Sequence, residues 1–353
     1  MPGEFEPHEG TLMIWPWRPG SWNYGAKAAR AAFAEIAEAI AAYEQVYLFV
    51  RPQDKASAQE LLSSDRIHLI EAQTEDAWAR DTGATFVIND QGGRRGIQWE
   101  FNAWGGQYDG LYSHFEHDRE VPERICNFLG DSFYNARPFV LEGGSIHVDG
   151  EGTVLTTEMC LLSAGRNPSL SKDEIEQKLC EYLNCSKVLW LKDGIDPDET
   201  NGHIDDVACF IRPGEAACIY TEDKSHPFYR QSQDAYHRLL KMTDAKGRKL
   251  KVHKICCTKE PVRLGNFMID KTSDSIGRPA GELCIASYLN FLIVNGGVIV
   301  PQYGDANDAL ALEQIQSLFP DRKAVGVMTR EIVYGGGNIH CITQQQPAIS
   351  SDI

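Results

Sequence analysis

Segments with strand character alternate with helical segments along most of the 353-residue chain. Apolar residues at helical spacing predict a helix over Ala26–Tyr43, and a second helix over Lys172–Leu183 opens with a capping box formed by Ser171 and Glu174. Runs rich in β-branched and aromatic residues predict strands over Gln45–Val50, Thr85–Ile88, Thr153–Thr157, Lys187–Leu191, Val207–Ile211, Ala217–Thr221, Phe291–Val300 and Glu331–Tyr334. This alternation predicts an α/β fold. Because no Pro-rich linker or charge block divides the sequence, we expect one catalytic domain over residues 1–353.

One short motif occurs twice in the chain. The segments Glu142–His147 and Gly335–His340 share the pattern Gly-Gly-[Ser/Asn]-Ile-His, and each follows an apolar run. A third polar turn, Thr200–Asp206, precedes the strand predicted at residue 207. Similar turns at the edges of strands indicate a duplicated structural unit.

The charge balance restricts the kind of partner. Fifty Asp and Glu residues against 34 Lys and Arg residues give a formal net charge of −16. Nucleic-acid phosphates require a basic surface, so we expect no nucleic-acid partner and favour a cationic ligand.

The apolar residues and the cysteines indicate the compartment. The longest apolar stretch, Cys284–Pro301, is interrupted by polar residues and a Gly-Gly pair, so no membrane span is predicted. The first residues lack a basic segment followed by an apolar one, which predicts no secretory signal. The ten cysteines form no CxxC pair and no regular framework. We therefore expect reduced thiols in a cytoplasmic protein.

Two turns carry candidate catalytic residues. Cys341 closes a segment that contains three consecutive glycines, which favour a turn where a ligand approaches the backbone. The alternative is a buried, inert thiol. His203 and Asp205 lie on the same side of an extended segment, where one could move protons and the other could hold a cation. A surface turn is the alternative there.

Carboxylates complete the candidate site. Asp81 follows Trp78 closely, Glu142 precedes the first Gly-Gly turn, and the pair Asp198-Glu199 stands before the His203 turn. Acidic turns with one His and one Cys are typical of a cysteine enzyme that acts on a positively charged substrate. The sequence contains no dinucleotide or Walker loop, no zinc-ligand spacing and no GxSxG elbow, so we expect neither a cofactor nor a metal.

The ordered motifs resemble a known family. They are Pro2–Gly10 (PGEFEPHEG), Trp78–Gly83 (WARDTG), Phe101–Gly106 (FNAWGG), Leu141–Gly150 (LEGGSIHVDG), Asp198–Asp205 (DETNGHID), Asn295–Gln302 (NGGVIVPQ) and Gly335–Gln346 (GGGNIHCITQQQ). On these motifs the chain resembles the agmatine deiminases of the guanidine-modifying superfamily and is similar to bacterial-type peptidyl-arginine deiminases. It departs from them in having Ala84 where a Pro is usual, and around Ser113–His117.

The resemblance implies a fold, a reaction and a set of roles. The implied fold is a five-bladed α/β propeller, the pentein fold, with pseudo-fivefold ββαβ repeats. The implied reaction converts agmatine and water to N-carbamoylputrescine and ammonia through a covalent thiouronium intermediate, without a cofactor. The resemblance assigns Cys341 as the nucleophile, His203 as the acid and base, Glu142 as its orienting partner, Asp81 and Asp205 as the guanidinium clamp, and Trp78 and Glu199 as substrate-channel residues. It also implies a homo-oligomer, a dimer or tetramer.

Two alternatives remain open from the sequence. A related enzyme could act on peptidyl-arginine or free arginine, but the pair Asp198-Glu199 at the far end favours the ammonium of agmatine over a carboxylate. A non-catalytic binding protein could use the same scaffold, because fold alone does not fix function.

Overall fold

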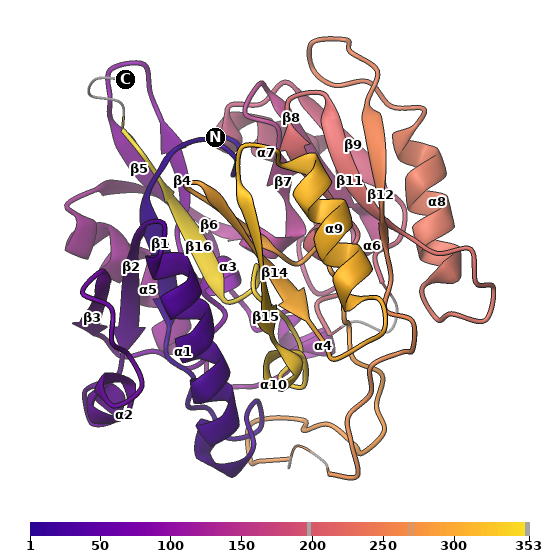
Figure 1. Ribbon diagram of the computed structural model, residues 1–353. Coiled ribbons are helices and arrows are strands. Elements are labelled where there is room, and N and C mark those ends of the chain that lie inside the picture. The colour runs from indigo at the N-terminus through magenta and orange to yellow at the C-terminus, as the bar shows by residue number, and fades with distance from the viewer. Residues whose placement is uncertain (196–198, 268, 270, 350–353) are drawn as a thin grey trace.

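The computed structural model describes residues 1–195, 199–267, 269 and 271–349 (Figure 1). In this described part of the chain the strands form five sheets, four of three strands and one of four. The strands are β1 (His8–Ile14), β2 (Gln45–Val50), β3 (Ile67–Glu71), β4 (Thr85–Ile88), β5 (Arg94–Glu100), β6 (Ser132–Val140), β7 (His147–Val148), β8 (Thr153–Thr157), β9 (Lys187–Leu191), β10 (Ala208–Arg212), β11 (Glu215–Tyr220), β12 (Lys251–Cys256), β13 (Leu292–Val294), β14 (Gly297–Gln302), β15 (Lys323–Met328) and β16 (Thr343–Pro347). The α-helices are α1 (Lys27–Ala41), α2 (Lys55–Gln59), α3 (Ala79–Thr82), α4 (Gly106–Asp109), α5 (Glu116–Leu129), α6 (Glu158–Leu161), α7 (Lys172–Leu183), α8 (Tyr229–Leu239), α9 (Asp308–Leu318) and α10 (Arg330–Val333).

The five sheets repeat one ββαβ pattern. In each three-stranded sheet the first two strands are antiparallel, and the third strand is parallel to the middle one. A parallel pair needs a crossover connection, which α5, α7, α8 and α9 provide. In the remaining sheet α1 connects the parallel strands β1 and β2, and β16 pairs with β1 in antiparallel fashion. The two ends of the chain therefore complete one unit together (Figure 1).

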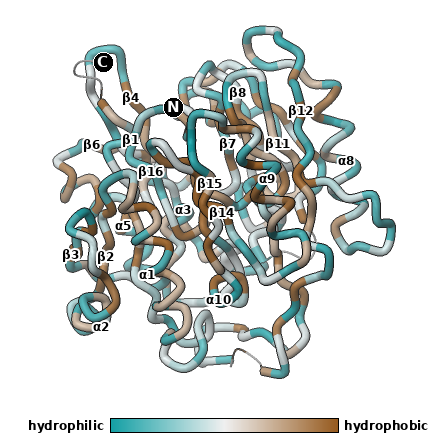
Figure 2. Tube along the Cα trace, in the orientation of Figure 1, coloured by the Kyte–Doolittle hydropathy of each residue, from teal (hydrophilic) through white to brown (hydrophobic). Residues whose placement is uncertain are grey.

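The helices cover the outer faces of the sheets with their apolar sides. On α1, for example, Phe33, Ile36 and Ile40 are buried, while the opposite side of the helix carries polar residues. Figure 2 shows hydrophobic residues concentrated on strands such as β14 and β15, and hydrophilic residues on the outer loops. Across residues 1–195, 199–267, 269 and 271–349, no helix has both the length and the apolarity to cross a bilayer.

Most of the sequence predictions for this fold are confirmed. The α/β class holds, α7 has the predicted bounds, and its capping box from Ser171 to Glu174 is formed. Four predicted strands have the same bounds as β2, β4, β8 and β9. The predicted strand Phe291–Val300 is divided into β13 and β14 by a hairpin at Asn295 and Gly296, where Gly296 has a φ of 79°.

One predicted strand is wrong. Glu331–Tyr334 was expected to be extended, but Arg330–Val333 forms the short helix α10. The N–H groups of Ile332 and Val333 donate to the carbonyl oxygen of Thr329 at 2.9 and 3.0 Å, so no strand partner is needed. Both side chains are buried all the same. A short apolar run satisfies burial equally well as helix or strand, and periodicity cannot separate the two.

Candidate active site

The five ββαβ units place polar groups at one common location. Asp81 comes just before β4, Gly144 before β7, Asp205 before β10, Asn290 before β13 and Cys341 before β16. Direct contacts join them: the N–H of Gly144 donates to Asp81, and Cys341 Sγ contacts both Asn290 and Asp205. The turn before the first strand of each unit thus contributes to one site. Both Gly-Gly-x-Ile-His turns occupy this position in their units.

The Cys341 thiol lies at the centre of these contacts. The side-chain N–H of Asn290 donates to Sγ at 3.2 Å, and Asp205 Oδ2 lies 3.6 Å from Sγ. A Cβ atom on Gly337 would lie 2.5 Å from the Trp78 ring and 3.2 Å from Sγ, which explains the glycine at that position. Burial, followed by the negative charge of Asp205, raises the pKa of Cys341 well above its usual value. The raised pKa favours the protonated thiol at neutral pH.

Two buried carboxylates flank the thiol, and their environments differ. Trp104 Nε1 donates to Asp81 Oδ2 at 2.8 Å, and the N–H of Gly144 donates to Oδ1 at 2.9 Å. Asp205 Oδ2 lies 2.8 Å from His340 Nδ1, whereas Asp205 Oδ1 has no hydrogen-bond partner in the described part of the chain. Burial raises the pKa of Asp81. Burial acts in the same direction on Asp205, but the imidazole of His340 outweighs it and lowers the pKa of that carboxyl.

The His203 imidazole lies between two carboxylates. Its Nδ1 is 3.8 Å from Asp81 Oδ2, and its Nε2 is 3.7 Å from Glu142 Oε2. Burial disfavours the imidazolium, but Asp81, a contact with the Cys160 thiol and Glu142 together raise the pKa of His203 well above its usual value. A Cβ atom on Gly144 would lie 2.6 Å from His203 Nδ1, so only glycine fits against the ring.

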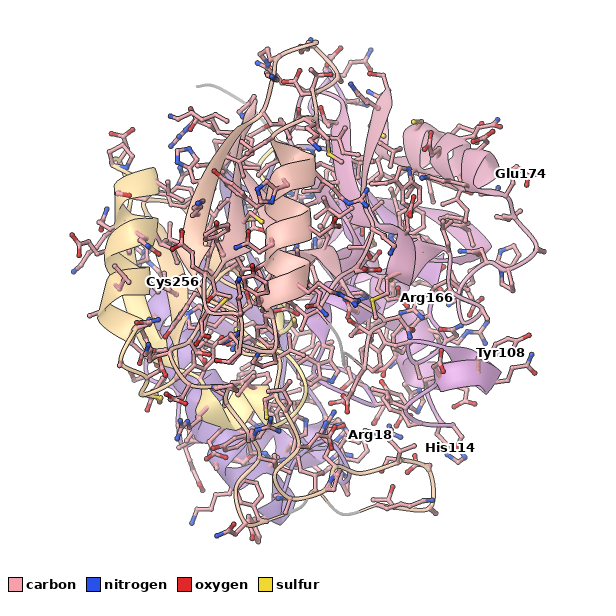
Figure 3. The ribbon with its side chains drawn as sticks, turned by 90° about the vertical axis from the view of Figure 1, so that its right-hand side faces the viewer. Arg18, Tyr108, His114, Arg166, Glu174 and Cys256 are labelled. Atoms are coloured by element: carbon pink, nitrogen blue, oxygen red, sulfur yellow. The ribbon has the colours of Figure 1, made fainter. Side chains whose placement is uncertain are left out.

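Arg166 fixes Glu142 and the loop that carries His203. Its Nε donates to the Glu142 carboxylate at 2.9 Å, and its two terminal nitrogens donate to the carbonyl oxygens of Trp104 and Thr200 at 2.7 and 2.9 Å. In Figure 3 Arg166 lies inward of Glu174, which is on the outer helix α7. Burial opposes ionisation of Glu142, but the Arg166 guanidinium outweighs it and lowers the pKa of this carboxyl. The pair is therefore charged at neutral pH.

A second group of buried residues supports Asp205 from behind. His340 Nε2 lies 2.9 Å from Glu4 Oε2, and Arg80 Nε donates to the carbonyl oxygen of His340 at 3.2 Å. The His147 ring stacks on His340 with 6.0 Å between ring centroids, and burial lowers the pKa of His147 to about 4. His340 therefore bridges two carboxylates.

Three clusters of described residues have enough ligand atoms, all within 4.8 Å of one another, to be considered for a metal ion. They are Glu4, His147 and His340; Glu142, Cys160 and His203; and Asp205, Asp206 and Cys341. At the first cluster Arg80 lies 3.6 Å from Glu4, and at the second Arg166 binds Glu142. These guanidinium groups oppose a bound cation. The third cluster surrounds the thiol itself.

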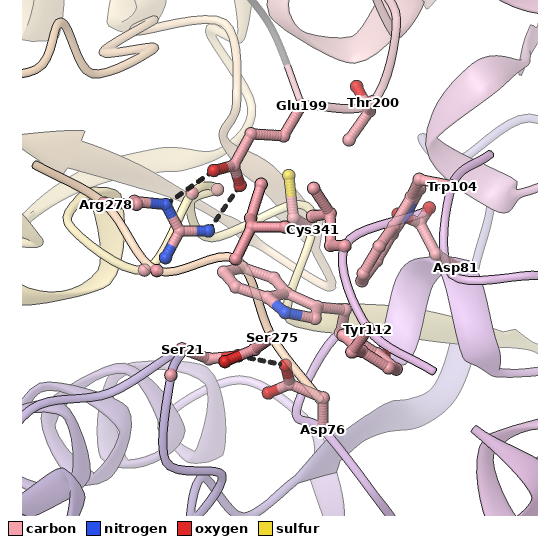
Figure 4. A pocket seen from close by; sticks show the side chains of 18 residues that line it. Ser21, Asp76, Asp81, Trp104, Tyr112, Glu199, Thr200, Ser275, Arg278 and Cys341 are labelled. Carbon is pink, nitrogen blue, oxygen red and sulfur yellow. Dashed lines mark hydrogen bonds and ion pairs between the residues drawn. The ribbon is translucent and has the colours of Figure 1, made fainter. Parts of the chain in front are cut away.

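The thiol opens onto a pocket (Figure 4). Cys341 and Asp81 line one part of it, and Trp78, stacked on Trp22 with 5.2 Å between ring centroids, lines a wall. Glu199 and Arg278 line another part, joined to each other by two hydrogen bonds. Asp198, which the sequence pairs with Glu199, lies outside the described residues.

All seven residues predicted for the site come together. Cys341, Asp81, Trp78 and Glu199 line the pocket, and the remaining three, His203, Glu142 and Asp205, adjoin these residues through the contacts given above. The sequence did not predict the involvement of Asn290, Arg166, His340 or Arg278. The repeated position before each first strand could have indicated Asn290. The arginines stand in loops without a motif of their own.

Residues 1–347 match the family model of Porphyromonas-type peptidyl-arginine deiminases, and the chain therefore belongs to this family of hydrolytic deiminases. Among its relatives, a Streptococcus mutans serotype c protein with the provisional name agmatine deiminase is 61% identical over 352 residues, which cover 99% of this chain and 95% of the relative. A solved structure of an agmatine deiminase of Enterococcus faecalis is 60% identical, with a TM-score of 0.97 over 99% of this chain and 96% of the other. A C. jejuni agmatine deiminase with substrate bound is 26% identical, with a TM-score of 0.81 over 98% and 95% of the two chains. The resemblance predicted from the motifs and the prediction of an enzyme are confirmed, and the non-catalytic alternative is not favoured.

Proposed function

We propose that this protein hydrolyses agmatine to N-carbamoylputrescine and ammonia, with Cys341 as the nucleophile. The observation that carries this proposal is Asp205 Oδ1, a buried carboxylate oxygen without a hydrogen-bond partner in the described residues, whose carboxylate is 3.6 Å from the thiol. A buried acceptor without a donor is costly, and a charged donor compensates it best. A guanidinium supplies planar N–H pairs that match a carboxylate. The similarity to agmatine deiminases supports this substrate.

The proposed reaction assigns one role to each group. Asp81 and Asp205 hold the guanidinium so that its central carbon faces the sulfur. The Cys341 thiolate adds to that carbon, and His203 donates a proton to the departing nitrogen, so the C–N bond breaks and ammonia leaves. A covalent thiouronium remains. His203 then takes a proton from water as the oxygen adds to the carbon. The C–S bond breaks to release the thiolate, and the new hydroxyl group loses its proton to solvent and becomes the carbonyl of the product.

Charge explains how the thiolate would form. The carboxylates near Cys341 disfavour a negative sulfur in the empty site, as the raised pKa of the thiol indicates. A bound guanidinium neutralises these carboxylates and lowers the pKa of the thiol. The raised pKa of His203 keeps its imidazole protonated at neutral pH, ready to act as the acid in the first step. Deprotonation would therefore follow substrate binding.

Peptidyl-arginine and free arginine are the alternative substrates, since the family takes its name from peptidyl-arginine. At the end of the carbon chain opposite the guanidinium, free arginine carries a carboxylate and peptidyl-arginine carries a peptide carbonyl. Agmatine carries only an ammonium there. The carboxylate of Glu199 in the pocket favours the ammonium.

We also propose that the five units close around a central channel as a five-bladed propeller forming one domain over residues 1–353; the pairing of β16 with β1 supports this. A cytoplasmic location and a homo-oligomer remain predictions.

The test measures ammonia release from agmatine, arginine and a peptide with an internal arginine. We expect agmatine to be preferred and Cys341→Ser to abolish turnover without changing the circular dichroism spectrum. Cys180→Ser, at a half-buried cysteine outside the pocket, is the matched control and should retain activity. A haloacetamidine should label Cys341, and agmatine should prevent the labelling. Turnover by Cys341→Ser, or a preference for arginine or the peptide, would overturn the proposal.

A further inference from the structure

A partly buried ion pair lies in the wall of the catalytic pocket. Arg278 Nε donates to Glu199 Oε1 at 2.7 Å, and Arg278 Nη2 donates to Glu199 Oε2, so the two groups meet as parallel forks (Figure 4). The exposed fractions of the two side chains are 11% for Arg278 and 21% for Glu199. The same two residues also line a neighbouring pocket.

The backbone on both sides holds this pair in place. Arg278 exchanges two backbone hydrogen bonds with Ile269, at 2.8 and 2.9 Å. On the other side, a Cβ atom on Gly336 would lie 2.7 Å from both Arg278 Nη2 and Glu199 Oε2, and Gly336 has a φ of 110°. Only glycine at position 336 allows the ion pair to lie against this turn. The turn belongs to the same segment of the chain as Cys341.

The pair leaves one donor unused. Arg278 Nη1 is buried and has no hydrogen-bond partner among residues 1–195, 199–267, 269 and 271–349. It belongs to a guanidinium whose other N–H groups are engaged by Glu199. The Arg278 side chain lines the pocket, and a guanidinium there is suited to a carboxylate, but the adjacent charge of Glu199 repels one.

We propose that Arg278 is a latent carboxylate-binding residue and that Glu199, by neutralising it, makes the pocket select amines over amino acids. The inference rests on the proposed function and deepens it. Agmatine and arginine share the guanidinium and the carbon chain, and they differ in a carboxylate at the far end. In the wild-type protein Glu199 attracts the ammonium of either substrate and repels the carboxylate of arginine. Without its charge, Arg278 pairs with that carboxylate.

The experiment compares kcat/KM for agmatine, arginine and argininamide in wild type and Glu199→Gln. The amide of argininamide keeps the size of the carboxylate but removes its charge. Loss of a charged hydrogen bond should lower kcat/KM for agmatine about 10–100-fold in the variant. The ratio of kcat/KM for arginine to that for agmatine should rise about 10-fold or more, and arginine should exceed argininamide by about 10-fold.

A second variant and a control identify the cause. In Glu199→Gln/Arg278→Gln the preference for arginine over argininamide should disappear. Glu282→Gln removes another acid of the neighbouring pocket and should change the ratio by less than about twofold. Glu199→Ala should reproduce the rise in the ratio of kcat/KM for arginine to that for agmatine. This variant shows that the rise does not depend on the side-chain amide of the introduced Gln.

The inference would be overturned if the ratio stayed constant in both Glu199 variants, or if its rise persisted without Arg278. These outcomes differ from failure of the proposed function. If wild type released no ammonia from any of the three substrates, the proposed function itself would be wrong.

Discussion

Replacing Asp205 by Asn should make the Cys341 thiol more reactive and the enzyme less active. Asp205 Oδ2 lies 3.6 Å from Sγ, and its negative charge disfavours the thiolate. Asn has nearly the same shape but no charge. The thiol pKa should therefore fall, and a larger fraction of the sulfur should be ionised at neutral pH. Turnover should fall nevertheless, because half of the proposed guanidinium clamp is lost.

The magnitude follows from the distance. Two unit charges about 4 Å apart interact by about 4 kcal/mol at an effective dielectric constant of about 20. One pKa unit corresponds to about 1.36 kcal/mol, so the thiol pKa could fall by at most about 3 units. His340 and Arg80 already offset part of the Asp205 charge. We therefore expect a decrease of about 1–3 units, and alkylation about 10-fold faster or more at neutral pH.

The assay is alkylation of Cys341 by iodoacetamide between pH 6 and pH 10. Because the chain contains ten cysteines, the modified peptide that contains Cys341 is quantified by mass spectrometry. Asp223→Asn, at an exposed carboxylate outside the catalytic pocket, is the matched control and should titrate like wild type. Ammonia release from agmatine is measured on the same preparations.

The reasoning would be refuted if alkylation of Cys341 at a given pH were no faster in Asp205→Asn than in wild type. It would also be refuted if the variant retained wild-type turnover, because then the carboxylate would not hold the substrate.

Three further predictions follow from contacts in the site. Arg166→Met leaves the buried Glu142 charge uncompensated and should reduce the free energy of unfolding by about 3–5 kcal/mol in urea titrations; Arg166→Met/Glu142→Gln should recover part of the loss. Gly144→Ala inserts a Cβ atom 2.6 Å from His203 Nδ1 and should lower kcat about 100-fold or more, with a stability cost of about 1–3 kcal/mol measured by the same titrations. Burial and the charge of Arg80 lower the pKa of His340, but Glu4 and Asp205 outweigh them and raise it. Protonated His340 therefore stabilises the fold fully below about pH 6.5, and this stabilisation is lost as the pH rises through the raised pKa. The stability difference between wild type and His340→Asn should therefore be smaller at pH 9 than at pH 6.

The sequence allowed much of the fold to be predicted because local signals agreed with tertiary packing. The capping box at Ser171 and the apolar face of α1 are local features, and both occur where predicted. The prediction of a strand over Glu331–Tyr334 was wrong because two consecutive apolar residues can be buried in a helix as well as in a strand. Strands such as β1, which pairs with β16 from the other end of the chain, depend on partners that periodicity cannot reveal.

The site could be predicted only where its residues lie in dense motifs. Cys341, His203 and Asp205 lie in turns that contain glycines. Close contacts in the folded protein require those glycines, so the turns can be recognised in the sequence. Asn290 stands in an apolar stretch and was interpreted as an interruption of it, although its amide donates to the Cys341 thiol. Arg278 has no neighbouring motif. Its importance arises from a pairing with Glu199, 79 residues away in the sequence.

The carboxylates of the site divide into two kinds, and this division supports a positively charged substrate. Glu142 and Glu199 each accept hydrogen bonds from an arginine of the protein, Arg166 and Arg278 respectively. Asp81 and Asp205, which flank the thiol, accept no hydrogen bond from an arginine in the described residues, and one oxygen of Asp205 has no donor there. This difference supports the proposal that Asp81 and Asp205 hold the guanidinium of the substrate. A neutral ligand could donate to that oxygen, but it would not offset the carboxylate charge that helps to raise the pKa of Cys341.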